Sequence, residues 1–361
     1  MSQNVQNKNN QITETKTVEN LNKSKEEKLK NLTNNKGKFI MSLLFVGILG
    51  TFGGFYAGKE VGRTLPATHR DYSKSQVLAT VGDIKITGED LSKKMEPYFY
   101  IQGLKKLSEE EIETQETNTL NYITNLEALY KAGVDNKIKV TDKEVDETYS
   151  KNMATIESNF SLTEEEYLNK FNLTKDEVKE NIKKELVATK YLQENSTVSE
   201  EEAKNYYNNN KEDFFKIRAS HILISNYDKD GKEVSDKKKA ENKKKAESIL
   251  KRAEKGENFD DLALEYSDDN YNASKGGDLG YFAKDEMVEP FEKAAFSIKK
   301  DGDIYPKVVE TTYGYHIIKK TGEKYSSFEE NKDSLIEALT DSKQNTLLQD
   351  ALEKYDVKIN M

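Results

Sequence analysis

The sequence contains no cysteine. It therefore has no disulfide framework, no thiolate nucleophile and no thiol that could accept a lipid, so its stability has to come from the packing of side chains. Histidine is scarce as well, with three in 361 residues. Basic residues number 56 against 65 acidic ones, which gives a net charge of -9. This charge argues against a nucleic-acid-binding protein, which would present a basic face.

Charged residues are absent from one segment, residues 39–58, which read FIMSLLFVGILGTFGGFYAG. At 1.5 Å per residue, a helix of this length can cross a hydrocarbon layer of about 30 Å. Because polar sequence flanks the segment on both sides, we expect a transmembrane anchor rather than a buried core helix. Residues 1–38 are polar and show no apolar periodicity, which predicts a disordered tail.

The basic residues around this segment predict its orientation. Six lysines lie between Lys23 and Lys38, and four basic residues lie between Lys59 and Lys74. The excess favours a cytoplasmic N-terminus and a single-pass protein of the cell membrane, with the catalytic part extracellular. Small residues at 57–58 leave a cleaved signal peptide as an open alternative, although the long tail and the full spanning length favour an uncleaved anchor.

After a linker at 59–75, residues 77–81 and 84–86 predict a small hairpin, and residues 87–213 predict a succession of short amphipathic helices. The helix starts are marked by a Ser or Thr that is followed three residues later by Asp or Glu, so that each side chain can satisfy a free amide of the first turn. These pairs are Thr87–Asp90, Ser108–Glu111, Thr141–Glu144, Thr163–Glu166, Thr174–Glu177 and Ser199–Glu202.

From Phe214 onward the pattern changes to that of an α+β domain. The predicted elements are a strand at 215–224, a Lys-rich helix at 237–255 with a solvated basic face, a short helix at 259–266, and strands at 308–312 and 315–319. After Lys324 one long helical pattern leads to a short strand at 357–359. A lone helix and strand cannot bury their apolar face, so we expect residues 322–361 to pack on the helical segment 76–213. The domain at 214–321 would then be an insertion.

Three short motifs lie inside this insertion: RASHILI at 218–224, GGDLGYF at 276–282 and YGYHII at 313–318. In combination they resemble the parvulin family of peptidyl-prolyl isomerases. The wider layout over residues 76–361 resembles the PrsA extracytoplasmic foldases of Gram-positive bacteria and their relative SurA. PrsA proteins are usually held by an acylated cysteine, which this chain lacks, so the membrane segment would replace that anchor.

The resemblance implies a small antiparallel sheet with helices, inserted in a mostly helical, chaperone-like domain. It also implies that His221 and His316 are paired imidazoles at the centre of the sheet. Asp269 matches the position beside the twisting amide, and Asp268 is the competing candidate because the register of the loop is uncertain. The residues that the resemblance assigns to substrate binding are Leu279, Met287 and Phe291 in an apolar proline pocket, Phe296 lining or supporting it, and Tyr313 near the site.

Each of these groups also has a purely structural interpretation. A single buried histidine is usually a satisfied core residue, and a Met with two Phe is usually plain core; only the combination of motifs favours a site. A hydrolase is disfavoured because Ser220 precedes His221 on a strand and faces the opposite side. Two histidines and a carboxylate can bind a metal, but nothing else supports a metal site, and no cofactor is expected. Residues 225–228 lack the basic cluster of phosphate-directed parvulins, so substrates should be unphosphorylated.

The function that follows is a membrane-anchored peptidyl-prolyl isomerase and foldase that assists secreted proteins. Rotation about a peptide bond meets a barrier of about 18–20 kcal/mol. Catalysis requires no nucleophile, only selective stabilisation of the twisted X–Pro amide. The partners would be unfolded polypeptides with X–Pro bonds and the membrane, but no nucleic acid. Two alternatives stay open: a holdase with an inactive parvulin domain, and a membrane-assembly protein with one fixed partner. The oligomeric state is open as well, a homodimer included.

Overall fold

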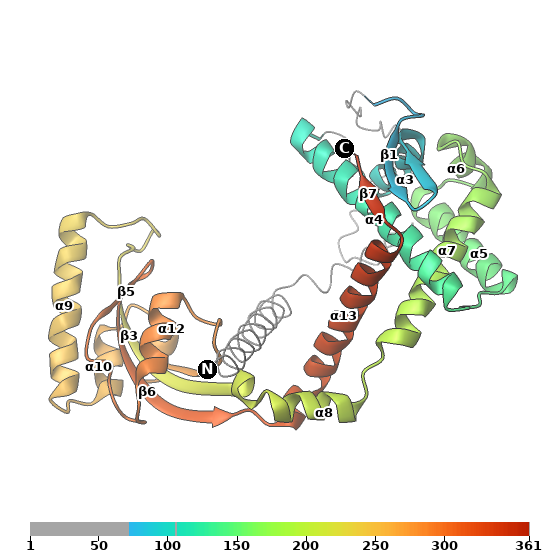
Figure 1. Cartoon of the computed structure of the whole chain (residues 1–361). Coiled ribbons are helices and arrows are strands. Elements are labelled where there is room, and N and C mark those ends of the chain that lie inside the picture. Colours follow the sequence, from blue (N-terminus) through green and yellow to red (C-terminus); the bar gives the residue numbers. More distant parts are fainter. Residues whose placement is uncertain (1–71, 105–106, 361) are drawn as a thin grey trace, which may run out of the picture. The chain divides into compact units, whose positions relative to one another are not determined.

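The structure is a computed structural model that describes residues 72–104 and 107–360 (Figure 1). The predicted tail, the predicted membrane segment and almost all of the predicted linker lie outside these residues. Within the described ranges, no helix combines the length and the apolar character that a membrane span requires. The described residues divide into two compact units: the helical unit, formed by residues up to Ser199 together with those from Leu335 onward, and the sheet unit, Glu200–Ser334.

The helical unit begins with a hairpin of β1 (Val77–Val81) and β2 (Ile84–Thr87), as predicted. Five helices follow: α3 (Gly88–Gln102), α4 (Glu109–Asp135), α5 (Asp142–Phe160), α6 (Glu164–Lys170) and α7 (Lys175–Ser196). Each begins with the predicted capping box, in which the Ser or Thr and the acidic side chain bond to each other's backbone amides. Two of these helices are not short, since α4 has 27 residues and α7 has 22.

The C-terminal strand lies in the same small sheet as the first strand of the described chain. The long helix α13 (Phe328–Lys354) precedes β7 (Val357–Ile359), which pairs antiparallel with β1 in the order β2-β1-β7. Leu348 and Ala351 of α13 are buried in the same core cluster as Leu78 and Val81 of β1. The apolar face of the returning segment is therefore covered by the helical unit.

The sheet unit holds four antiparallel strands in the order β4-β3-β6-β5 (Figure 1). The strands are β3 (Phe215–Ser225), β4 (Asp278–Phe282), β5 (Val309–Thr311) and β6 (Gly314–Tyr325). Its helices are α8 (Glu200–Asn209), the 3-10 turn η1 (Lys211–Phe214), α9 (Asp236–Glu254), α10 (Phe259–Tyr266), α11 (Asn270–Ala273) and α12 (Glu289–Ser297). The sequence did not predict β4 or α12, and β6 continues six residues beyond the predicted strand end at Lys319.

The unit boundary falls earlier than the change of sequence pattern at Phe214. The ring of Tyr207 in α8 packs against two other rings, with centroid separations of 4.7 Å to Phe214 and 5.9 Å to Phe328. Its hydroxyl also donates to the backbone oxygen of Ser326 at 2.9 Å. These contacts tie α8 to the first turn of α13, so both belong to the sheet unit although their sequence is helical.

Alternate residues of β3 and β6 serve the two faces of the sheet, because successive side chains of a strand point to opposite sides. Ile222 and Ile317 lie on the face covered by α9 and α10. Ala219 and Ile318 lie on the other face, with Phe291 of α12. Each face therefore has its own apolar core.

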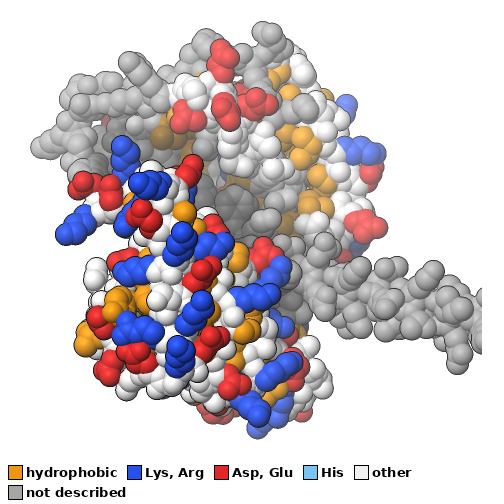
Figure 2. All heavy atoms as spheres, turned by 90° about the vertical axis from the view of Figure 1, so that its left-hand side faces the viewer, with side chains coloured by type: hydrophobic (Ala, Val, Ile, Leu, Met, Phe, Trp, Pro, Cys, Tyr) orange, Lys and Arg blue, Asp and Glu red, His pale blue; other side chains and the backbone are white. Residues whose placement is uncertain are grey.

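The Lys-rich helix α9 is confirmed and buries a narrow stripe that includes Ala246 and Ile249. The side of the molecule on which α9 lies faces the viewer in Figure 2, where Lys and Arg side chains alternate with Asp and Glu. Such mixed charge is typical of a solvated face, as the sequence predicted.

Candidate active site

The two histidines of the sheet unit lie diagonally across the β3–β6 pair. In the register of this pair His221 is opposite Ile318, and His316 is opposite Leu223. Diagonal neighbours on one face of a sheet are within reach of long or aromatic side chains. The two Nδ1 atoms are 3.1 Å apart, and the rings lie nearly parallel, with an interplanar angle of 19° and centroids 5.3 Å apart. Both side chains are buried, at 6% and 4% exposed.

The loop between α10 and α11 brings a carboxylate to the first of these imidazoles. Oδ2 of Asp269 lies 2.8 Å from Nε2 of His221. Asp268 instead turns to the edge of β3, where its Oδ2 accepts the backbone N–H of Ser225 at 2.8 Å. Of the two candidate aspartates, Asp269 is therefore the one that contacts the imidazole pair.

This loop takes the place of β4 beside the second half of β3, since β4 pairs with β3 only as far as Ser220. The hydroxyl of Ser267 accepts the N–H of Leu223 at 3.1 Å, and the N–H of Asp268 donates to the oxygen of Leu223 at 2.7 Å. Gly277 accepts the N–H of His221 at 2.9 Å. The edge of β3 is thus hydrogen-bonded along the site, which holds Asp269 in place.

Gly277 is required for this close approach. Its φ is +76°, and an added Cβ would lie 2.1 Å from the backbone oxygen of His221. Only glycine combines this backbone conformation with the absence of a Cβ.

The hydrogen-bonded chain has a fourth member that the sequence reasoning missed. Oγ1 of Thr311 lies 2.8 Å from Nε2 of His316. Thr311 is the last residue of β5 and lies opposite Gly314 of β6, two residues before His316. The signal for it was the tight turn at Gly314, which fixes the register of the hairpin and places a residue five positions before His316 on the same face.

The hydrogen positions in this chain follow from the groups at its two ends. The carboxylate of Asp269 can only accept, so Nε2 of His221 carries a hydrogen, and Nδ1 of the neutral ring accepts. His316 therefore donates from Nδ1, which leaves its Nε2 as an acceptor for the hydroxyl of Thr311. The backbone N–H of Tyr313 donates to the same hydroxyl at 3.1 Å, so its own hydrogen is available to His316. All donors along the chain point toward Asp269.

Burial favours the neutral form of both rings. Burial lowers the pKa of His221, and this effect outweighs the opposing contact with Asp269. Burial and the neighbouring His221 lower the pKa of His316 to about 3. Burial alone would raise the pKa of Asp269, but hydrogen bonds from Asn272 and His221 outweigh it, so this pKa is lowered and the carboxyl is ionised.

Of the predicted pocket residues, Phe291 lies directly beside the imidazoles. Phe291 presents its ring edge-on to both histidines, at 5.8 Å from His221 and 5.3 Å from His316. The other predicted residues, Leu279, Met287 and Phe296, are partly buried against the same core cluster. Phe296 packs edge-to-face against Phe282 and Phe215 rather than against a histidine, so it supports the cluster. Tyr313 lies in the β5–β6 turn with 56% of its surface exposed.

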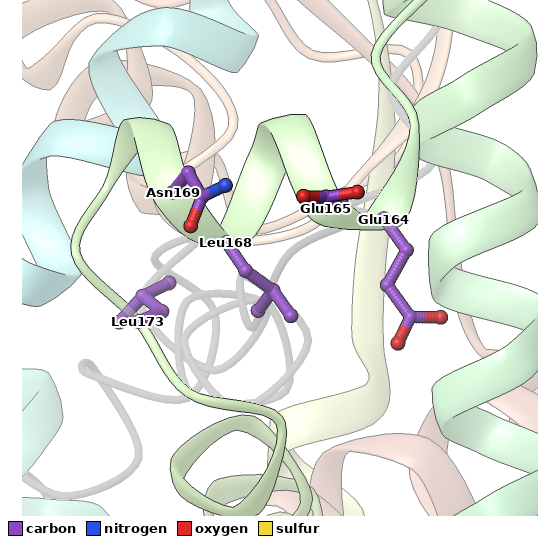
Figure 3. A pocket seen from close by; sticks show the side chains of 5 residues that line it. All are labelled: Glu164, Glu165, Leu168, Asn169 and Leu173. Carbon is purple, nitrogen blue, oxygen red and sulfur yellow. The ribbon is translucent and has the colours of Figure 1, made fainter.

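A separate hollow lies on the helical unit beside α6, with a volume of about 340 Å³ (Figure 3). Leu168 and Leu173 point into it, and Glu164, Glu165 and Asn169 complete its lining. Glu164 is paired with Lys175 at 3.1 Å. The lining thus combines an apolar floor with an acidic rim, and it contains no group that belongs to the imidazole chain.

Comparison with known proteins agrees with the two units. Residues 205–324 match the family model of the PPIC-type peptidyl-prolyl isomerase domain, and residues 29–192 match that of the SurA-like N-terminal domain. Foldase protein PrsA of Bacillus subtilis is 38% identical over 231 residues, which are 63% of this chain and 69% of that protein. Foldase protein PrsA of Caldanaerobacter subterraneus is 36% identical over 239 residues, 66% of each chain.

Among solved structures, the peptidylprolyl isomerase PrsA of Bacillus anthracis is 30% identical and covers 67% of this chain and 99% of that one, with a TM-score of 0.32. The family membership is therefore established by the sequence matches. The chain belongs to the PrsA family of foldases and is a peptidyl-prolyl cis–trans isomerase with a parvulin-type domain.

Proposed function

We propose that the chain is a membrane-anchored, extracytoplasmic foldase that isomerises X–Pro bonds of unfolded secreted polypeptides. In this proposal the catalytic residues are His221, His316 and Asp269, and the proline ring is held by Leu279, Met287 and Phe291, with Phe296 supporting the pocket and Tyr313 at its edge. The observation that carries the proposal is the buried hydrogen-bonded chain, which runs beside the apolar cluster around Phe291.

The arrangement suits a reaction that moves no proton and forms no covalent bond. Each ring nitrogen of His221 and His316 already has a hydrogen-bond partner, so both imidazoles are held in one orientation. The ionised carboxylate of Asp269 is only partly buried, beside the pocket. A fixed charge next to the twisting amide can favour a charge distribution that the planar amide lacks, and each 1.4 kcal/mol of such preference is worth about tenfold in rate.

The same geometry disfavours a hydrolase. The hydroxyl of Thr311 is hydrogen-bonded to His316, as a nucleophile is to its general base in a hydrolase. A general base needs a pKa near the working pH, however, and that of His316 is about 3. Ser220, the other hydroxyl next to a histidine, precedes His221 on the strand and so lies on the opposite face of the sheet.

The catalytic assignment is tested with a pair of neighbouring substitutions. Asp269→Ala removes the acceptor of His221 and should lower kcat/KM on a short X–Pro peptide by about tenfold or more. Asp268→Ala removes only the acceptor of the Ser225 amide and should leave kcat/KM within about twofold. Equal losses in the two variants would reject the assignment. Proline-limited refolding of a model protein provides the second readout.

The holdase alternative predicts a different pattern. If the helical unit binds unfolded chains independently of the isomerase site, the variants Asp269→Ala and His221→Ala should still suppress the aggregation of an unfolded client protein. The hollow beside α6, with Leu168 and Leu173 in its lining, is the feature of the helical unit that favours this alternative. Substitution of both leucines by Ser should then weaken suppression of aggregation while leaving peptide isomerisation intact.

The proposed topology rests on residues 39–58 and on the lysines that precede them. The absence of cysteine makes it directly testable, because a single introduced cysteine is the only thiol. In intact cells, a membrane-impermeant maleimide should label Ser248→Cys, on the exposed side of α9, but not Ser24→Cys in the N-terminal tail. Labelling of the second variant alone would reverse the topology, and labelling of both or neither would reject it.

A further inference from the structure

Two exposed tyrosines stand at the two ends of the hydrogen-bonded chain. Tyr271 follows Asp269 by two residues and is 74% exposed, and Tyr313 follows Thr311 by two residues and is 56% exposed. Two residues span at most about 7 Å, so each tyrosine is anchored close to its end of the chain. Each end of the hydrogen-bonded chain therefore has an exposed tyrosine two residues away in the sequence. Tyr313 already had a predicted role near the site, whereas Tyr271 had none.

The backbone of Tyr271 is tied to the site carboxylate. Asp269 caps the short helix α11, accepting the N–H of Asn272 at 3.3 Å with Oδ1 and the side-chain amide of Asn272 at 2.8 Å with Oδ2. Tyr271 lies inside this turn. A movement of its backbone would disturb the hydrogen bonds of Asp269, so the backbone of Tyr271 is fixed relative to this carboxylate.

The ring of Tyr271 is held by a cation. The ammonium of Lys275 lies over it, 4.0 Å from the ring centroid. This contact covers one face and restricts the ring, while most of the side chain stays in solvent. A large aromatic side chain that is restrained yet exposed is what recognition surfaces use, because little conformational entropy is lost when a ligand stacks on it.

The charges around Tyr271 decide which ligand suits it. Lys275 above the ring disfavours a second cation, and Asp268 and Asp269 in the same loop disfavour a carboxylate. A neutral aromatic ring meets neither repulsion and can stack offset or edge-on. The exposed Tyr281 offers a contrast: its ring lies under Arg218 and Lys324, at 5.9 Å and 5.0 Å, at the end of β3 away from the imidazoles.

We infer that Tyr271 is a specificity-determining residue, which selects substrates with an aromatic side chain next to the X–Pro bond. The inference rests on the proposed function, because it takes the imidazole chain as the place where the bond twists. It adds the class of residue that the isomerase prefers beside proline.

The test uses the full chain as the enzyme and measures isomerisation of three substrate peptides by exchange NMR. One peptide has Phe before proline, one has Phe after proline, and one has Ala at both positions. The wild type should show a higher kcat/KM on at least one Phe peptide than on the Ala peptide, by about fivefold. Tyr271→Ala should reduce this ratio to about one. Tyr271→Phe, which keeps the ring, should retain it.

Tyr281→Ala is the matched control, since it also removes an exposed tyrosine of the sheet unit, and its ratio should stay at the wild-type value. Peptides with Glu or Lys beside proline should show no advantage over Ala. A wild type without preference for Phe, or a ratio that Tyr271→Ala leaves unchanged, overturns the inference. A wild type that is inactive on all peptides rejects the proposed function instead. Wild-type imidazole resonances in Tyr271→Ala and Tyr271→Phe show that the site is intact.

Discussion

Nδ1 of His221 and Nδ1 of His316 face each other at 3.1 Å, and only one of them can carry the hydrogen between them. The carboxylate of Asp269 at the other side of His221 decides which. The pair therefore has a direction, and that direction has measurable consequences.

The two histidines should be opposite tautomers. We expect His221 to carry its hydrogen on Nε2 and His316 to carry its hydrogen on Nδ1, because the carboxylate accepts and the hydroxyl of Thr311 donates. Nitrogen chemical shifts of the two imidazoles distinguish the tautomers directly. The same tautomer in both rings would contradict the direction of the chain.

Acidification should destabilise the sheet unit well above the pH at which the carboxylates titrate. The pKa of His316 is about 3 in the folded chain, against 6.5 for a free histidine. The unfolded state therefore binds more protons between these values, and the free energy of unfolding falls as the pH drops below about 6.5. From about pH 7.5 to about pH 5.5, His316 alone accounts for about 1.4 kcal/mol, and His221 adds to it.

This prediction is checked by denaturant unfolding of the full chain at the two pH values. The free energy of unfolding is measured with a signal that comes from residues of the sheet unit. Replacement of His316 by Phe should flatten the dependence. Direct titration of His316 by NMR provides the complementary test, since protonation near pH 6 in the folded chain would contradict it. Asp269 does not contribute in this window, because its pKa lies below the usual 3.8.

Loss of the Thr311 hydroxyl should weaken the site without unfolding it. Thr311→Val keeps the shape of the side chain but leaves Nε2 of His316 without a donor and the Tyr313 amide without an acceptor. We expect a loss of about 1–2 kcal/mol in stability and several-fold in kcat/KM. Thr312→Val, at an exposed neighbour, should change neither by a measurable amount.

Two glycines of one motif should differ in their response to a methyl group. Gly277 and Gly280 both have positive φ, +76° and +73°. At Gly280 an added Cβ meets nothing within 4 Å, so Gly280→Ala should cost only the backbone strain, about 1–2 kcal/mol. Gly277→Ala adds a collision with the oxygen of His221 and should cost clearly more, with loss of peptide isomerisation. Thermal unfolding and kcat/KM of both variants check this, and equal effects would contradict the assigned packing.

Removal of the last strand should destabilise the helical unit and spare the isomerase site. A chain truncated after Asp356 loses β7, which pairs with β1 and whose successor Asn360 donates to the oxygen of Leu78 at 2.8 Å. We expect about 1–3 kcal/mol less stability in the helical unit. Hydrogen exchange should become faster at Thr80, which lies opposite Lys358 and whose amide faces β7, while the imidazole resonances stay in place. The exposed substitution Lys358→Ala serves as the control.

The helix starts show how much of this fold the local sequence predicts. Thr87, Thr141 and Thr174 mark their helices because the capping box is satisfied within four residues. An equivalent box at Ser327 and Glu330 precedes α13 and is readable from the sequence in the same way. β4 was missed since GGDLGYF owes its strand conformation to pairing with β3, and α12 was missed since its pattern is short.

By itself, the sequence determined that His221 and His316 occupy strands, since alternation and glycine turns are local properties. Through the resemblance to parvulins, it also narrowed the carboxylate of the site to two adjacent aspartates, Asp268 and Asp269. Only the tertiary structure decided that Asp269 rather than Asp268 meets the imidazole, that Thr311 completes the chain and that Tyr271 stands at its end. The contact of Thr311 follows from the register of the β5–β6 hairpin, whereas the choice of Asp269 depends on how a loop lies against a strand edge more than 40 residues away in the chain. No local periodicity encodes such a relationship, because it arises from backbone hydrogen bonds between segments that meet only when the sheet forms.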